Sequence, residues 1–198
     1  MNKDYFSEKN DLDIRFNLTM IIPTLNRPDV LYAQVKSLIR NFNRIKPKIK
    51  IQLYISENNS DVEKKINKNI LNSIIEKNIN ESMEFIFIRR TERISLGNHM
   101  NLLSKSVNCD WITWIGDDDL LTPTYLSYII RVIELDDVNV QSVFPGHYTN
   151  NYFTQDDFFE LSNSIEPIDD KIQVEKYNLD SKSIVKIINR GTQLSGLL

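Results

Sequence analysis

Short apolar runs that alternate with helix-like segments are the feature that most constrains the fold of this chain. Each run has the length of one strand, and the segment after it repeats apolar residues at helical spacing. We predict strands over residues 18–23, 50–56, 83–90, 111–116 and 140–145. This alternation predicts an α/β fold, with a mainly parallel sheet and helices on both faces. The aromatic run 111–116 is interpreted as a strand buried on both faces.

Helices are predicted between these strands and after the fourth. The first begins near Pro28, because proline is tolerated in the first helical turn. Asp61 is expected to cap the second helix, with Val62 on its apolar face. Thr122 is expected to cap the helix that follows the fourth strand. In the third helix, we interpret His99 as a surface residue.

The composition excludes several classes of protein. A net charge of −3 gives no electrostatic reason to expect a nucleic-acid partner. One cysteine excludes an internal disulfide, and two histidines leave little for a zinc site. No apolar run is long enough to span a membrane and no signal peptide follows Met1, so we expect a cytoplasmic protein.

The pattern divides the chain into three regions. Residues 1–17 are charged and weakly periodic, and are predicted to form an N-terminal arm. Residues 18–145 carry the strand–helix alternation and form the core. Residues 146–198 have loop character, and their apolar end indicates an incomplete or short C-terminal region.

Polar segments follow the first four predicted strands. They are residues 23–28, 56–61, 89–98 and 116–121. Ligands of an open parallel sheet bind beyond the carboxyl ends of its strands, so these segments are expected to meet at one cleft. The last contains three consecutive aspartates, Asp117 to Asp119, whose mutual repulsion a bound cation would offset.

Glycine-rich phosphate loops are absent from the sequence. Only five glycines occur, and none stands in a G-x-G pair or before Lys-Ser/Thr, which excludes a dinucleotide fingerprint and a P-loop. A nucleotide bound here would need a cation held by carboxylates, a role suited to Mg²⁺ or Mn²⁺. If strand geometry continues through the aspartates, Asp117 and Asp119 share a side while Asp118 points elsewhere.

Four segments, taken together, resemble the family 2 glycosyltransferases of the GT-A fold. "MIIPTLNRP" is similar to the first-strand motif of that family, and "LYISENNSD" is similar to its second-strand motif. "ISLGNHMNLLSKSV" resembles the segment that leads into the helix before the metal motif. "DWITWIGDDDLLTPTYL" resembles the metal-binding D-x-D strand end and the helix after it. The order and spacing match over residues 18–145.

The resemblance implies a hexosyltransferase-type enzyme that depends on a nucleotide-sugar and on Mn²⁺ or Mg²⁺, with a UDP-sugar favoured as the donor. The residues expected to bind the nucleotide-sugar are Pro23, Thr24, Asn26, Arg27, Glu57, Asn58, Arg93, Asn101, Asp117 and Asp118. Metal ligands are expected among Asp117, Asp118 and Asp119. Glu57 stands where the family has an aspartate that reads the base, which leaves the base preference open. Gly116 takes the place of the family's first aspartate in one register, which favours Asp118 and Asp119 as ligands over Asp117.

The acceptor side carries fewer signals. A carboxylate base would deprotonate the acceptor hydroxyl in an inverting displacement. Its candidates are Asp156, Asp157, Asp169 and Asp170, and no motif singles one out. The expected acceptor is a saccharide or a lipid-linked saccharide in bacterial surface polysaccharide synthesis, with peripheral association at the inner face of a membrane. Two alternatives stay open: a catalytically silent nucleotide-sugar-binding domain or partner subunit, and a sugar nucleotidyltransferase. The glycine-free first loop argues against the second.

Overall fold

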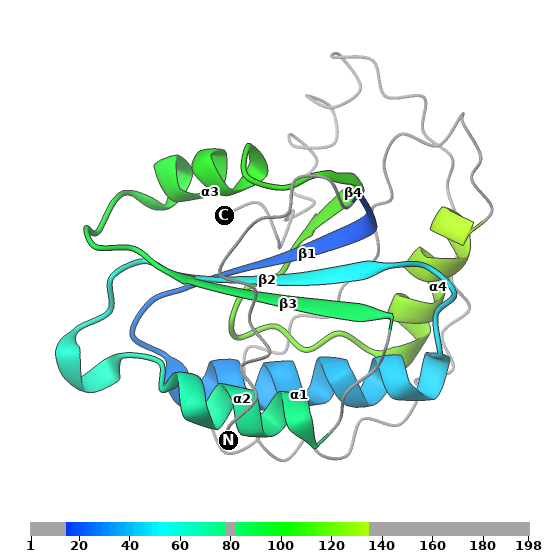
Figure 1. Ribbon diagram of the computed structural model, residues 1–198, viewed down its shortest axis with the longest axis horizontal. Helices are drawn as coiled ribbons and strands as arrows, with labels where there is room; N and C mark the ends of the chain where they lie inside the picture. Colours follow the sequence, from blue (N-terminus) through cyan, green and yellow to red (C-terminus); the bar gives the residue numbers. More distant parts are fainter. Residues whose placement is uncertain (1–14, 78–81, 135–198) are drawn as a thin grey trace, which may run out of the picture.

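A parallel four-stranded sheet forms the centre of the computed structural model, which describes residues 15–77 and 82–134. The strand order is β3-β2-β1-β4 (Figure 1). The strands are β1 (Phe16–Thr24), β2 (Ile51–Glu57), β3 (Met83–Arg89) and β4 (Cys109–Trp114). Their parallel pairing requires a crossover between neighbours, as the sequence pattern predicts.

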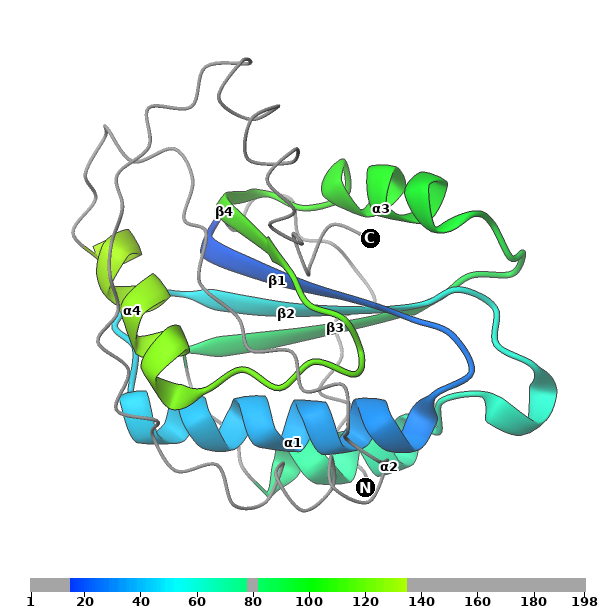
Figure 2. The ribbon, with the colours of Figure 1, turned by 180° about the vertical axis from the view of Figure 1, so that it is seen from behind.

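Helices cover both faces of the sheet. On one face lie α1 (Pro28–Ile45), α2 (Lys68–Glu76) and α4 (Pro123–Glu134), and on the other lies α3 (Leu96–Ser104) (Figures 1 and 2). A short 3-10 helix, η1 (Val62–Lys64), precedes α2. The predicted α/β fold, a mainly parallel sheet with helices on both faces, is therefore confirmed.

The hydrophobic core is divided by the sheet into two unequal parts. The larger part joins alternate residues of the strands to α1, α2 and α4, with Leu53, Leu38 and Leu126 among its buried members. The smaller part lies under α3 and includes Ile21 and Tyr54. Because β1 and β2 are buried almost throughout, apolar burial fixes their register and the direction in which each strand ends.

Two sequence predictions about these elements are wrong. The second α-helix begins at Lys68 with Asn67 as its cap, so Asp61 does not cap it, and Val62 is 81% exposed. Within the described sheet β4 is an edge strand, and Ile112 is 41% exposed rather than buried. The apolar composition of β4 predicted a strand correctly but overstated its burial.

The remaining boundaries agree with the predicted pattern where the structure describes them. Pro28 is the first residue of α1, and the Thr122 hydroxyl accepts a hydrogen bond from the Tyr125 N–H at 3.2 Å at the start of α4. Three predicted regions lie outside the described residues: the strand 140–145, nearly all of the N-terminal arm, and the region 146–198. None of the helices within residues 15–77 and 82–134 is long and apolar enough to cross a membrane.

Candidate functional site

The aspartate turn, residues 116–119, follows β4 and lies beside the carboxyl end of β1. The Thr24 hydroxyl donates a hydrogen bond to Asp117 Oδ2 at 2.7 Å. Asp117 is buried, with 6% of its surface exposed. Burial raises the pKa of the Asp117 carboxyl, outweighing the hydrogen bond from Thr24 and the charge of Arg27, which both lower it. Two residues predicted from separate motifs are thus in direct contact.

Arg27 connects the first two aspartates of this turn. Its Nη1 donates to Asp117 Oδ1 at 3.1 Å and to Asp118 Oδ2 at 2.5 Å. The side chains of Arg27 and Asp118 are 51% and 57% exposed, so this part of the turn faces solvent. Burial lowers the pKa of Arg27, but the charges of the two aspartates outweigh it and raise the pKa overall. One guanidinium therefore bridges two carboxylates and offsets one of their two negative charges.

The third aspartate closes the turn on itself. Asp119 Oδ2 accepts a hydrogen bond from the Gly116 N–H at 3.0 Å, and the Asp119 N–H donates to the Gly116 carbonyl at 3.1 Å. A Cβ at position 116 would lie 2.9 Å from Asp119 Oδ2 and 3.0 Å from Asp118 Oδ1. A side chain at position 116 would therefore displace the carboxylates of Asp118 and Asp119 from their present positions.

This turn overturns one geometric expectation. Strand β4 ends at Trp114, so the alternation of strand side chains does not reach the aspartates. Asp117 and Asp118 converge on Arg27, whereas Asp119 folds back to the main chain. The expected pairing of Asp117 with Asp119 on one side is therefore wrong.

Two buried amides of α1 bind the backbone between β4 and α4, Gln34 within the aspartate turn and Asn41 just beyond it. Neither was predicted from the sequence. Gln34 Nε2 donates to the carbonyls of Gly116 and Asp119, the second at 3.0 Å. Asn41 Nδ2 donates to the carbonyl of Leu121 at 3.0 Å. Neither amide residue has any exposed surface. Their signal in the sequence is a pair of amides on a largely apolar helix stripe, because buried polar groups need hydrogen-bond partners.

Glu57 has a different environment at the end of β2. It has no exposed surface, its Oε2 accepts from Arg89 Nε, and its Oε1 accepts from the Ile66 N–H at 3.0 Å. Arg89 also donates to the Ile66 carbonyl at 2.6 Å. Both oxygens of Glu57 are engaged in joining β2, β3 and the segment before α2. A role in reading the base stays a prediction.

A polar network joins the loops after β1, β2 and β3. Asn26 Nδ2 donates to Asp61 Oδ2 and the Asp61 N–H donates to Asn26 Oδ1, both at 2.7 Å. Arg93 Nη2 donates to Asp61 Oδ1 at 2.8 Å. Asn58 bonds the backbone of Ile94 twice, at 2.8 and 3.1 Å. The backbone of Asn26 has φ of 60°, a left-handed conformation in which asparagine is enriched. Three predicted residues therefore hold these loops together.

The remaining predicted residues lie outside these clusters. Pro23 is half-buried within β1, and Asn101 is exposed on α3. On the same helix, His99 is buried, and its Nε2 lies 2.7 Å from the Ser56 hydroxyl of β2. Burial and the charge of Arg90 lower the His99 pKa to about 4. The prediction that His99 is a surface residue is wrong.

The aspartate turn suits a divalent cation whose coordination a substrate completes. Asp117 Oδ1 and Asp118 Oδ2 approach the same nitrogen, so the turn already places two carboxylates around one cationic group. Within residues 15–77 and 82–134, no three His, Cys, Asp or Glu side chains are grouped to hold a metal unaided. Mg²⁺ sites in proteins often use one or two carboxylates and leave the other positions to water and substrate phosphates. The two aspartates fit that kind of site.

Comparison with known proteins identifies the family. A solved structure, the mannosyltransferase PcManGT from Pyrobaculum calidifontis in complex with GDP-Man and Mn²⁺, is similar at 15% identity and a TM-score of 0.47. The similarity covers 66% of this chain and 35% of that one. No curated protein matches the chain. The profile of Glycosyl transferase family 2 matches residues 19–185, a span that contains all four polar segments at the strand ends. This chain therefore belongs to glycosyltransferase family 2.

Proposed function

We propose that this chain transfers a sugar from a nucleoside-diphosphate sugar to an acceptor hydroxyl, with Mn²⁺ or Mg²⁺ at the aspartate turn. The observation that carries the proposal is the pair Asp117 and Asp118, fixed at the carboxyl end of a parallel sheet and faced by Arg27. Family membership supports the class of reaction. A UDP-sugar is the donor proposed first.

The chain's own residues supply the geometry for such a transfer. Thr24 orients the buried carboxylate of Asp117, and Gln34 holds the backbone of the turn. When bound, the cation would neutralise charge that develops on the departing diphosphate. Arg27 and Arg93, both about half exposed at the strand ends, add positive charge where an anionic donor is expected.

The acceptor side of the proposal extends beyond the described residues. The four aspartates considered as the general base, Asp156, Asp157, Asp169 and Asp170, all lie outside them. We propose a saccharide or lipid-linked saccharide acceptor and an inverting displacement, in a cytoplasmic enzyme of bacterial surface polysaccharide synthesis. Peripheral contact with the inner face of a membrane belongs to the same proposal.

A panel of nucleotides tests the donor part. Thermal unfolding is measured with Mn²⁺ alone and with Mn²⁺ plus UDP, GDP, CMP or their sugar conjugates. Because a ligand that binds only the native state stabilises it, one nucleotide class should raise the Tm beyond the effect of Mn²⁺. Mass spectrometry of the same mixtures should show slow hydrolysis of the matching sugar donor. No stabilisation by any nucleotide would reject the proposal, and binding without hydrolysis or transfer would favour the silent binding domain.

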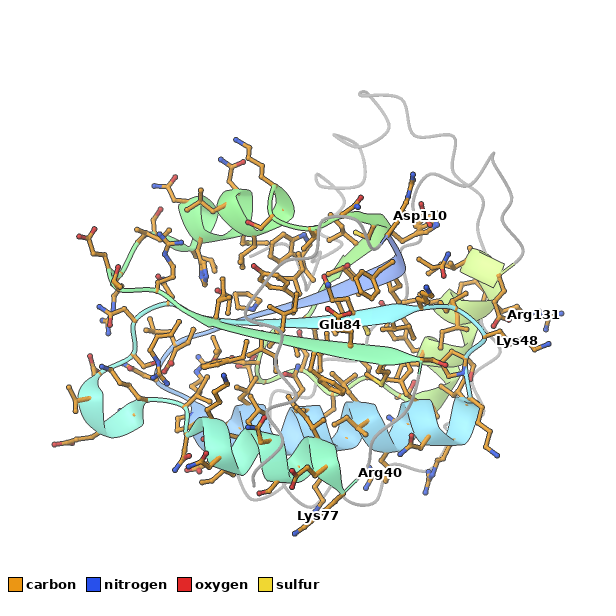
Figure 3. The ribbon with its side chains drawn as sticks, in the orientation of Figure 1. Arg40, Lys48, Lys77, Glu84, Asp110 and Arg131 are labelled. Atoms are coloured by element: carbon orange, nitrogen blue, oxygen red, sulfur yellow. The ribbon has the colours of Figure 1, made fainter. Side chains whose placement is uncertain are left out.

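Two isosteric variants test the position of the site. Asp118→Asn removes a half-exposed charge and should abolish the Mn²⁺-dependent part of nucleotide stabilisation. Asp110→Asn is the matched control, because Asp110 pairs with Arg15 at 2.5 Å where the strands begin, away from the proposed site (Figure 3). Equal nucleotide stabilisation of Asp118→Asn and the unmodified protein would rule out the aspartate turn as the cation site.

A further inference from the structure

One guanidinium nitrogen occupies the two carboxylate oxygens that the proposed function gives to a divalent cation. Arg27 Nη1 lies 3.1 Å from Asp117 Oδ1 and 2.5 Å from Asp118 Oδ2. A metal ion that used both oxygens would have to take the position of this nitrogen. Arg27 and the cation are therefore mutually exclusive partners of the same pair.

The two carboxylates need a counter-ion when no ligand is present. Asp117 and Asp118 are adjacent in sequence, and the Asp117 side chain is only 8% exposed. A carboxylate shielded from water and placed beside a second negative charge is costly without a positive partner. Arg27 supplies that partner within the protein itself. In the ligand-free protein it therefore stabilises the aspartate turn.

The guanidinium is placed so that it can leave. About half of the Arg27 side chain is exposed, so its departure does not open the hydrophobic core. The Arg27 carbonyl accepts from the Leu31 N–H at 3.1 Å, which anchors the backbone at the start of α1. The carboxylate of Asp117 stays fixed by Thr24 in the meantime. Side-chain rotation alone can free both oxygens.

We propose that Arg27 is a built-in counter-ion that competes with the divalent cation for Asp117 and Asp118, and that the donor diphosphate releases it. Arginine forms paired hydrogen bonds with phosphate groups, so a diphosphate offers the guanidinium a replacement for the two carboxylates. The inference rests on the proposed function. Its consequence is that cation and donor bind cooperatively, because each removes an obstacle to the other.

Linkage makes this consequence measurable. If the nucleotide strengthens cation binding by some factor, the cation must strengthen nucleotide binding by the same factor. Removing Arg27 should weaken this coupling and shift the two separate affinities in opposite directions. Cation binding improves because a competitor is gone, and nucleotide binding without metal worsens because a phosphate partner is gone. A general disturbance of the fold would weaken both.

The test uses Arg27→Gln, with Arg15→Gln as the matched control. Arg15 also forms an ion pair with an aspartate, Asp110, but at the opposite end of the strands. Free Mn²⁺ is measured by electron paramagnetic resonance in titrations without nucleotide. We expect Arg27→Gln to bind Mn²⁺ about tenfold more tightly than the unmodified protein, because the competing charge is gone. A tenfold change in affinity corresponds to about 1.4 kcal/mol. Arg15→Gln should bind Mn²⁺ unchanged.

A second titration measures UDP binding in the presence of EDTA. Arg27→Gln should bind UDP several-fold more weakly, and its Mn²⁺–UDP coupling should fall toward one. Unchanged or weaker Mn²⁺ binding by Arg27→Gln would overturn the inference, and Arg27→Met repeats the measurement if the glutamine variant does not fold. If no protein binds UDP or any other nucleotide of the thermal panel, the proposed function fails. The Mn²⁺ titration without nucleotide then still decides whether Arg27 competes with the cation.

Discussion

Two acidic clusters lie at the carboxyl end of the sheet, and they differ in what their charges contact. Glu57 is fully buried, and both of its oxygens are bound by Arg89 and the backbone of Ile66. Asp118, in the aspartate turn, is half exposed and contacts Arg27, whose side chain is also half exposed. The first cluster is saturated by the protein, whereas the second presents charge to solvent.

This difference separates residues that hold the elements together at the carboxyl end of the sheet from residues that can bind a ligand there. A carboxylate with both oxygens engaged by fixed partners contributes to the joining of elements, as Glu57 does between β2 and β3. A carboxylate held at its backbone, with a displaceable counter-ion, keeps its charge for a ligand. Variants in the two clusters should therefore separate loss of stability from loss of binding.

The largest loss of stability is expected for Glu57→Gln. The amide removes the charge that pairs with Arg89 and turns one hydrogen-bond acceptor into a donor. Breaking a buried ion pair by removing one partner costs about 3–5 kcal/mol in the free energy of unfolding. Urea denaturation followed by circular dichroism measures this loss. Glu63→Gln, in the exposed η1, is the control and should change stability by less than about 0.5 kcal/mol. A similar small change for Glu57→Gln would contradict its role as a structural link.

Much of the fold follows from the sequence because apolar periodicity reports burial directly. The four described strands and the start of α1 lie within a few residues of their predicted positions. The start of α2 was misplaced because Asp61 bonds Asn26 and Arg93 instead of capping a helix. Such long-range contacts leave no periodic signal.

The site was predictable in its location but not in its pairings. Polar segments at the strand ends correctly indicated the carboxyl end of the sheet, and Thr24 and Asp117 are in contact there. The turn after Trp114 could not be inferred from strand geometry, so the convergence of Asp117 and Asp118 on Arg27 was missed. Gln34 was not predicted because a polar residue on a helix stripe does not reveal which group it binds.

A smaller loss of stability is expected on acidification because of His99, which, like Glu57, is a buried residue within the fold. The native pKa is about 4, whereas an unfolded histidine titrates near 6.5. Above pH 6.5 both states are neutral and the stability is fully present. As pH falls from 6.5 toward 4, only the unfolded state gains a proton, so stability is lost, by about 2 kcal/mol at pH 5.

Comparison with His99→Gln isolates this contribution. The variant cannot take up the proton, so its stability should fall less steeply than that of the unmodified protein between pH 7 and pH 5. Urea denaturation at several pH values gives both profiles. Parallel profiles would show that His99 is accessible to protons in the native state, contrary to its burial against Ser56.

Gln34→Leu is expected to cause the smallest loss of stability of the three variants. Its main effect should be on nucleotide binding. The leucine removes the hydrogen bonds to the carbonyls of Gly116 and Asp119, and a net loss of about 1 kcal/mol is typical of such contacts. The turn then loses the support that fixes its carboxylates, so the Mn²⁺-dependent stabilisation by nucleotide should fall several-fold.

Asn41→Leu is the matched control, because Asn41 lies on the same stripe and binds the carbonyl of Leu121, beyond the turn. It should lose similar stability while keeping nucleotide binding. Equal losses of binding in both variants would mean that α1 supports the whole connection to α4 and not the aspartate turn in particular.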